Sequence, residues 1–455
     1  MKLIPIETPA ISHFAYLLCD GNEAAVIDPR RDVEEYVAAA SAQDCTIRYV
    51  VETHRQEDFV LGSAYLARLT GARMVTGKHE LFGHGDIRLG DGESFSLGSL
   101  RVVALETPGH TPESLCYAVY EADNDVPWCV FTGDTLFFGD TGRTDLPDVD
   151  DTAQNAGLIY DSIHQQLADL GDTTIVLPAH GPGSVCGSGM AEKPMSTIGA
   201  EKRYNKVFTM SRAEFVEYKG SERPPRPPYF RHMEKVNLRG GLPPKSIEHQ
   251  PDLLTSAKVA DMQHDHLLID TREPEAFAGG HVPDSYSVWM GGLPVFGGWV
   301  AEADTPIVLI CDRTDDVAVA TQHLNRIGID NVKAGLAGGF PSWRKEATPI
   351  RSCHVITPVA LHEERDRYLV LDVREDDEFA SGHIEGAQNI YVGYLSERLD
   401  QLKASKSDRI VVTCGVGHRA GVAVSILLKA GYTNVSNLLG GMSAWQKFKL
   451  PVVEG

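Results

Sequence analysis

Short apolar runs alternate with mixed polar and apolar stretches along the whole chain. Before residue 220, such runs predict β-strands at 24–27, 48–51, 100–105, 130–132 and 174–177, with helices between them. Histidine and aspartate residues lie just beyond several of these strand ends. Because α/β folds place their chemistry where strands end, we expect a functional site there.

An internal repeat organises the second half of the chain. LLIDTRE at 267–273 recurs as LVLDVRE at 369–375, GHVP at 280–283 as GHIE at 382–385, and GGFPSW at 338–343 as GGMSAW at 440–445. The same distance of 102 residues separates the members of each pair, as from Trp343 to Trp445. Three matches at one offset predict two tandem domains of about that length.

Apolar strands alternate with helical stretches inside each repeat. Strands are predicted at 306–310 and 409–413, and a predicted helix at 420–430 follows the second of them. This alternation is typical of a parallel α/β sheet.

A proline-rich stretch, RPPRPP at 223–228, separates the two halves. Prolines this dense exclude a helix interior or a central strand. We therefore expect a first domain at 1–220, an extended connector at 221–245, and repeat domains at 246–350 and 351–455.

Composition and charge narrow the function classes. The chain has 455 residues, of which 42% are hydrophobic and 23% charged, and a formal net charge of −21. The negative charge is spread along the chain, which disfavours nucleic acid and anionic membranes as partners. No apolar run is long enough to span a bilayer, and no signal peptide is recognisable. Eight scattered cysteines are typical of free thiols, so we expect a cytoplasmic protein.

A cysteine loop directly follows the strand predicted at 409–413. Cys414 is followed by Gly415, Val416, Gly417, His418 and Arg419 at the start of the next helix. Backbone N–H groups at a helix N-terminus stabilise a thiolate, and Arg419 adds a fixed positive charge. The loop resembles the Cys-x-x-Gly-x-Arg active loop of rhodanese sulfurtransferases. Tyrosine phosphatases have five residues between cysteine and arginine where this chain has four, which suits sulfur better than phosphate; a buried inert cysteine is the remaining alternative.

The first repeat has a different loop, CDRTDD at 311–316. Thr314 replaces the glycine and Asp316 replaces the arginine. Three carboxylates near Cys311 oppose thiolate formation. We interpret this repeat as a degenerate rhodanese-like domain with a structural or docking role.

The segment THRQEDF at 53–59 resembles the His-x-His-x-Asp-His loop of the metallo-β-lactamase superfamily, with Gln56 and Phe59 in place of two histidines. Four further segments resemble motifs of the same superfamily: VIDP at 26–29, TPGHTP at 107–112, TGDTLF at 132–137 and LPAHG at 177–181. The resemblance implies an αββα metallo-β-lactamase sandwich, followed by two rhodanese-like parallel α/β domains.

Five of the superfamily's metal-ligand positions remain: His54, Asp58, His110, Asp134 and His180. They would hold two zinc ions poorly. His54, His110 and Asp134 form a 2-His-1-carboxylate set, typical of non-haem Fe(II) oxygenases, and the resemblance to persulfide dioxygenases implies one Fe(II) per chain there. Asp58 and His180 would then orient ligands or bound water. Zinc is an alternative ion, Asp58 with Asp134 and His180 an alternative set, and a metal-free site a third possibility.

Three further positions bear on the substrate. Arg143 is expected at the cavity rim, where persulfide dioxygenases have an arginine that contacts the thiol carrier. Cys186 either reaches the cavity and carries a persulfide or is an exposed bystander. Pro182 stands where glutathione-using relatives have a tyrosine, which puts glutathione as the carrier in doubt. His13 and His79 are expected on the surface.

These resemblances together imply an iron-dependent persulfide dioxygenase fused to a rhodanese-type sulfurtransferase that acts in sulfide detoxification. Its partners would be a low-molecular-weight thiol persulfide, O2, and sulfite or thiosulfate, and we expect a homo-oligomer. One alternative is a glyoxalase II-like thioester hydrolase, which usually needs two metal ions and is disfavoured by Gln56 and Phe59. Another is a metal-free scaffold that delivers persulfides to the Cys414 domain.

Overall fold

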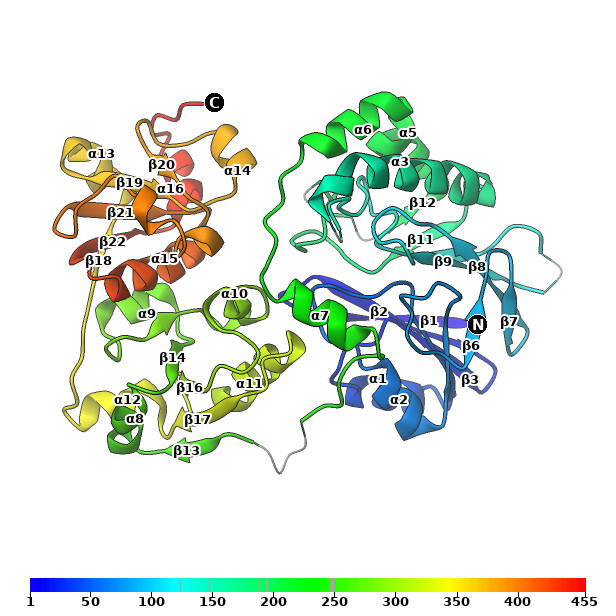
Figure 1. The fold of residues 1–455 in the computed structure, drawn as a ribbon, viewed down its shortest axis with the longest axis horizontal. Coiled ribbons are helices and arrows are strands. Elements are labelled where there is room, and N and C mark those ends of the chain that lie inside the picture. Colours follow the sequence, from blue (N-terminus) through cyan, green and yellow to red (C-terminus); the bar gives the residue numbers. More distant parts are fainter. Residues whose placement is uncertain (123, 147, 188, 194, 246–249) are drawn as a thin grey trace. The chain divides into compact units, whose positions relative to one another are not determined.

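The computed structural model describes residues 1–122, 124–146, 148–187, 189–193, 195–245 and 250–455. The chain forms two compact units, residues 1–226 with 230–244, and residues 227–229 with 245–455. The first unit contains the histidine and aspartate motifs, and the second contains both repeats (Figure 1).

Two six-stranded sheets form the centre of the first unit. In spatial order, the first sheet contains β1 (Lys2–Thr8), β2 (His13–Asp20), β3 (Glu23–Ile27), β4 (Thr46–Val51), β5 (Arg73–Gly77) and β6 (Ile87–Leu89). The second contains β12 (Ser196–Thr197), β11 (Ile175–Pro178), β10 (Cys129–Gly133), β9 (Leu115–Tyr120), β8 (Leu100–Glu106) and β7 (Ser94–Leu97). The predicted strands differ from the observed ones by at most two residues at either end.

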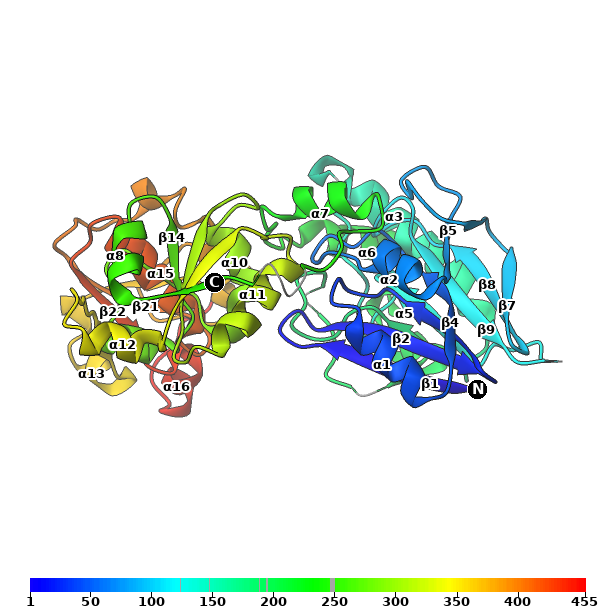
Figure 2. The same cartoon turned by 90° about the horizontal axis from the view of Figure 1, so that it is seen from below.

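Apolar contacts define the layers of this unit. One cluster lies between the sheets and joins Val75 to Tyr117. A second joins the first sheet to α1 (Glu34–Ala42) and α2 (Ser63–Thr70), as at Leu66. A third packs the second sheet against helices that include α3, as at Ile159. These helices are α3 (Thr152–Ser162), α4 (Ile198–Tyr204), α5 (Lys206–Thr209) and α6 (Arg212–Ser221). Helices outside and sheets inside confirm the αββα sandwich, whose layers are seen in Figure 1. Figure 2 shows the same unit from below.

Each repeat of the second unit forms a five-stranded sheet in which all pairs of neighbouring strands are parallel. The first contains β13 (Asp252–Leu254), β17 (Val332–Leu336), β16 (Ile307–Ile310), β14 (Leu267–Asp270) and β15 (Tyr286–Ser287). The second contains β18 (His354–Ile356), β22 (Asn434–Leu438), β21 (Arg409–Thr413), β19 (Leu369–Asp372) and β20 (Gln388–Asn389). The two sheets have the same strand order, which confirms the repeat.

Helices flank both sheets of the second unit. Those of the first repeat are α8 (Ser256–Met262), α9 (Pro274–Gly279), α10 (Leu293–Val300), α11 (Asp316–Arg326) and α12 (Gly339–Lys345). Those of the second are α13 (Pro358–Glu363), α14 (Asp376–Ala380), α15 (His418–Lys429) and α16 (Gly441–Lys447). The helix predicted at 420–430 is α15, which begins two residues earlier because His418 already has helical geometry.

The connector expected at 221–245 is not extended throughout. It contains α7 (Phe230–Asn237), which belongs to the first unit. The dense prolines end at Pro228, and no proline follows before Pro243, so a helix can form between them.

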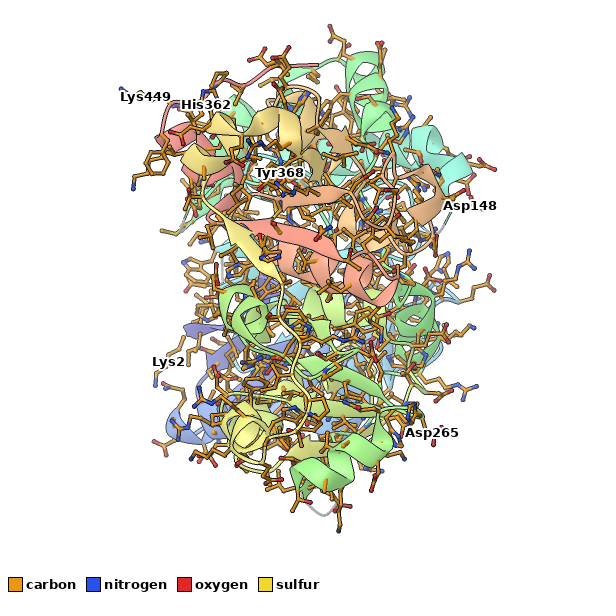
Figure 3. All side chains as sticks on the ribbon, turned by 90° about the vertical axis from the view of Figure 1, so that its left-hand side faces the viewer. Lys2, Asp148, Asp265, His362, Tyr368 and Lys449 are labelled. Carbon is orange, nitrogen blue, oxygen red and sulfur yellow. The ribbon has the colours of Figure 1, made fainter. Side chains whose placement is uncertain are left out.

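Both units have exposed charged side chains. Lys2, Asp148, Asp265 and Lys449 are exposed and project from the ribbon (Figure 3). None of the helices in the described ranges has the length and apolar character needed to cross a membrane.

Candidate functional sites

Strand ends of the first unit bring the metal motifs together. His54 follows β4, His110 lies between β8 and β9, Asp134 directly follows β10, and His180 follows β11. Because β10 and β11 are parallel neighbours, the residues after them lie at the same edge of the sheet. All four side chains are at most 2% exposed.

Three of these residues point ligand atoms at one another. His54 Nε2 lies 3.8 Å and His110 Nε2 3.5 Å from Asp134 Oδ2. None of the three atoms has a hydrogen-bond partner among the described residues, and the three residues form a possible metal-binding group. Buried polar atoms are normally paired, so three converging unpaired ones fit a single metal ion. The residues that were predicted as the iron set therefore lie together.

The other nitrogen of each histidine is held in place. His110 Nδ1 lies 2.9 Å from the Arg143 carbonyl oxygen, to which it donates. His54 Nδ1 lies 2.9 Å from Thr53 Oγ1, whose hydroxyl donates to Asp28 at 2.7 Å. These bonds leave each Nε2 free of a proton for a metal. Burial also lowers the pKa of His54 to about 3, which keeps that imidazole neutral.

His180 bridges two carboxylates beside the triad. Its Nδ1 lies 2.8 Å from Asp134 Oδ1, and its Nε2 lies 2.9 Å from Asp58 Oδ2. Burial lowers the pKa of His180, but the two carboxylates outweigh it and raise the pKa well above the usual value. A charged His180 fixes Asp134 with Oδ2 turned toward His54 and His110. The orienting role expected for Asp58 and His180 stays a prediction, which these contacts support.

Cys186 lies beside Asp58 and His180. One ligand atom each from Asp58, His180 and Cys186 lie within 4.8 Å of one another. Cys186 is 1% exposed, so it is not an exposed bystander. Burial, with the nearby carboxylates, raises the pKa of its thiol well above the usual value.

Gln56 and Phe59, which replace two motif histidines, both lie close to histidine side chains. The Gln56 Nε2 atom lies 3.4 Å from His54 Nδ1. Phe59 is fully buried, and its ring lies 4.1 Å from the His13 ring and 6.3 Å from the His180 ring. The ring therefore occupies apolar space beside His180. The expectation that His13 is a surface residue is wrong, because β2 brings it under this loop.

Arg143 does not lie at a cavity rim. Its side chain is about 2% exposed, and Nε and Nη2 bond to Asp145 at 2.7 and 2.6 Å. Nη1 and Nη2 also donate to the carbonyl oxygens of Val185, Pro224 and Pro225. The guanidinium therefore ties the start of the connector to this domain. A role in substrate binding stays a prediction, and it would require some of these bonds to be exchanged.

Two residues near the centre were not foreseen. Glu57 Oε2 lies 3.7 Å from His110 Nε2, and burial raises the pKa of this carboxyl to about 7. Asn237, at the end of α7, donates to the carbonyl oxygens of Gln56 and Phe59 at 2.7 and 2.8 Å. Glu57 could have been found as an extra carboxylate inside the motif. Asn237 had no sequence signal, since it lies far along the chain.

The cysteine loop of the second repeat is built around the sulfur. Gly417 N and Ala420 N lie 3.1 and 3.4 Å from Cys414 Sγ. Arg419 forms a two-bond pair with Glu378 at 2.6 and 2.7 Å. Gly417 has φ +113°, a backbone conformation that favours glycine. N–H groups that point at the sulfur support the predicted thiolate loop.

The corresponding loop of the first repeat is unsuited to a thiolate. The pKa of Cys311 is raised to about 12, first by burial and then by Asp270, Asp316 and Asp312. Of the three carboxylates expected near Cys311, Asp312 and Asp316 raise its pKa. Asp270 of β14 has this effect in place of Asp315.

The fold and these sites define a class: a metallo-β-lactamase fold with a candidate metal centre, joined to two tandem rhodanese-like domains. The second of these domains has the cysteine loop at 414–419, called the sulfur loop below. Comparison with protein families agrees. The metallo-beta-lactamase superfamily model matches residues 8–180, and the rhodanese-like domain model matches residues 255–346 and 357–448. The chain belongs to the metallo-beta-lactamase superfamily and carries two rhodanese-like domains.

The chain is also similar to individual proteins and solved structures. The human mitochondrial persulfide dioxygenase ETHE1 is 28% identical over 239 residues, which cover 51% of this chain and 86% of that protein. A probable metallo-hydrolase of Burkholderia pseudomallei is 31% identical over 235 residues, 43% of this chain and 77% of the relative. The crystal structure of a metallo-beta-lactamase from Staphylococcus aureus is 28% identical with a TM-score of 0.67, and the match covers 74% of this chain and 99% of that one.

Proposed function

We propose that the chain is an iron-dependent persulfide dioxygenase fused to a rhodanese-type sulfurtransferase. The observation that carries the first activity is the set of three converging, unpaired ligand atoms of His54, His110 and Asp134. The similarity to ETHE1 supports the persulfide as substrate. The loop around Cys414 and its homology to rhodanese-like domains support the second activity.

The dioxygenase reaction would consume R-S-SH, O2 and water and release R-SH, sulfite and two protons. Ferrous iron held by His54, His110 and Asp134 would supply the redox chemistry with O2. The chain itself orients the ligands, because His180 fixes Asp134 and the Arg143 carbonyl fixes His110. The buried side chains also keep bulk water away from the reacting sulfur.

The sulfurtransferase reaction would use Cys414 as nucleophile. The thiolate attacks the outer sulfur of thiosulfate, a new S–S bond forms on Cys414, and sulfite leaves with the electron pair of the broken S–S bond. In the reverse direction, sulfite attacks the outer sulfur of the Cys414 persulfide and thiosulfate is formed. The N–H groups of Gly417 and Ala420 stabilise the negative sulfur in both directions.

A thioester hydrolase remains the second candidate for the first unit. The observation that favours it is the group formed by Asp58, His180 and Cys186, which could hold a second metal ion beside the triad. Two metal ions suit hydrolysis by a metal-bound hydroxide.

The two candidates differ in their need for O2. Persulfides of glutathione, coenzyme A and other thiols are supplied to the iron-loaded protein in an oxygen electrode, and thioesters of the same thiols are supplied under anaerobic conditions. We expect O2 uptake that depends on a persulfide, with sulfite as product. Thioester hydrolysis without persulfide-dependent O2 uptake would replace our proposal with the hydrolase. The thiol carrier, the homo-oligomer and the cytoplasmic location stay predictions.

A further inference from the structure

His418 of the sulfur loop contacts the first repeat. His418 Nε2 lies 3.0 Å from Glu273 Oε2. The imidazole also stacks on Trp289, with ring centroids 4.8 Å apart and planes 12° apart. Trp289 in turn packs on Phe296 at 5.3 Å. The first repeat therefore holds His418 both by a hydrogen bond and by an aromatic face.

The backbone around His418 is also closely packed. Helices α9 and α15 lie side by side (Figure 1). A Cβ atom added at Gly421, one turn into α15, would lie 2.8 Å from Pro274 Cβ. Such a distance leaves no room for a larger side chain, so the start of α15 is seated directly on the start of α9.

His418 lies between the two residues whose backbone N–H groups face the sulfur of Cys414. The residue before it, Gly417, and the residue two after it, Ala420, supply the N–H groups that face Cys414 Sγ. Arg419, next to it, pairs with Glu378. A contact that fixes His418 therefore fixes the direction of both N–H groups and of the guanidinium.

The two repeats differ where this contact forms. Glu375, the counterpart of Glu273, takes part in a capping box with Glu378 at the start of α14. Among the described residues, the Glu273 side chain makes no such cap bond at the start of α9 and reaches His418 instead. The loop of the first repeat is thus unsuited to a thiolate at Cys311, while the glutamate of this repeat contacts the loop of the second.

We propose that the first repeat is a positioning element for the sulfur loop of the second, with Glu273 and Trp289 as positioning residues that act through His418. The proposal rests on the sulfurtransferase function proposed above and assigns the degenerate domain a part in it. The pair of Glu273 and His418 is largely exposed, at 62% and 40%, so its contribution to overall stability is small. Its effect belongs to the reactivity of Cys414.

The test uses the full-length protein and two readouts: the rate at which iodoacetamide alkylates Cys414, followed by mass spectrometry of its peptide, and kcat and KM for sulfur transfer from thiosulfate to cyanide. Glu273→Ala should slow the alkylation and lower kcat by about 3- to 10-fold, with KM for thiosulfate unchanged. Glu275→Ala is the matched control, because Glu275 is an exposed glutamate in the first turn of α9. It should leave both rates unchanged.

A double-mutant cycle separates positioning from general loosening. His418→Ala should slow alkylation at least as much as Glu273→Ala, because it removes the contacts with both Glu273 and Trp289, and the Glu273→Ala/His418→Ala double variant should be no slower than His418→Ala alone. Trp289→Phe should keep the parent rate and Trp289→Ala should not. Equal rates for Glu273→Ala and Glu275→Ala, or multiplicative losses in the double variant, would overturn the proposal. A parent protein without sulfur transfer would refute the proposed function, whereas the alkylation rates would still decide the positioning role.

Discussion

Each ligand atom of the candidate metal centre is oriented by a bond at the other end of its side chain. His54 is held by Thr53, His110 by the carbonyl of Arg143, and Asp134 by His180. Partners of this kind fix the ligand geometry and tune the affinity for the metal. The motif predicts the ligands, but the carbonyl that orients His110 comes from a loop whose path no motif describes.

His180→Gln should weaken the metal centre without removing a ligand. The variant loses the charged bridge from Asp58 to Asp134, so Asp134 Oδ2 is no longer fixed toward the histidines. We expect the affinity for Fe(II) to fall by about 10- to 100-fold, as measured by competition with a chelator under anaerobic conditions.

His164→Gln is the control for this experiment. His164 lies after α3, stacks on Tyr160 and bonds to the Val207 carbonyl, away from the triad. The His164→Gln variant should keep the Fe(II) affinity of the parent protein. An unchanged affinity in His180→Gln would show that Asp134 needs no such bridge.

The positions of several residues could not be predicted from local sequence patterns. His13 follows a turn and looks like a surface residue, yet the pairing of β2 places it under Phe59. Arg143 lies close to a metal ligand in the chain, but Asp145 and three carbonyl oxygens hold it inside the domain. Such positions depend on contacts between distant segments, which local patterns do not contain.

Glycines link α16 to the sulfur loop at the scale of secondary-structure elements. Gly441 has φ +54°, and a Cβ there would lie 2.3 Å from the Cys414 carbonyl oxygen and 2.7 Å from that of Gly415. Gly431 has φ +88°, and a Cβ there would meet nothing within 4 Å. The two positions therefore share the backbone strain of a substitution but differ in what the new methyl group would touch.

Gly441→Ala should disable the loop, and Gly431→Ala should not. Both variants should lose about 1–2 kcal/mol of stability from the left-handed conformation. Only Gly441→Ala displaces the loop backbone, so we expect its sulfur transfer from thiosulfate to fall by about 10-fold or more. Equal sulfur transfer in the two variants, measured beside their unfolding free energies, would contradict the close approach.

His281 gives the first repeat a pH dependence. The residue precedes β15, is 3% exposed and stacks on Phe277 at 3.8 Å. Burial lowers the pKa of His281 below the usual 6.5, with Arg272 and Arg351 adding to the effect. The unfolded chain therefore binds a proton more readily than the folded one, so the stabilisation is complete above the unfolded pKa and is lost as the pH falls through the folded pKa.

Calorimetry of the full chain tests the direction of this pH dependence. The transition midpoint of the second unit should fall as the pH is lowered from about 7.5 to about 5.5, and His281→Gln should make the fall shallower. His264→Gln, at an exposed position of the same repeat, should keep the slope of the parent protein. A steeper slope in His281→Gln would reverse the assignment.

At the scale of the whole molecule, the two proposed activities reside in different compact units. Asp134→Ala should therefore abolish persulfide-dependent O2 uptake and leave sulfur transfer from thiosulfate largely intact, because the Cys414 loop contains no residue of the metal centre. Cys414→Ser should do the reverse. Full sulfur transfer in Cys414→Ser would mean that Cys311 or Cys186 carries the sulfur.

The architecture was more predictable than the connections between its parts. Strand and helix periodicity and the repeat predicted the two parallel sheets, because both are local patterns, and the resemblance of the motifs to the metallo-β-lactamase superfamily implied the αββα sandwich. Helix α7 was not predicted, because the dense prolines before it indicated an extended connector. The contact of Glu273 with His418 joins residues 145 positions apart, and only the packed structure brings them together.

The central claim is a single iron centre at His54, His110 and Asp134 that oxidises persulfides. Its most direct test is the iron content and the O2 uptake of the full-length protein after anaerobic reconstitution with Fe(II). We predict about one iron per chain, O2 consumption that requires a persulfide, and loss of both in Asp134→Ala. Only trace iron in the parent protein, or undiminished O2 uptake in Asp134→Ala, would contradict the account.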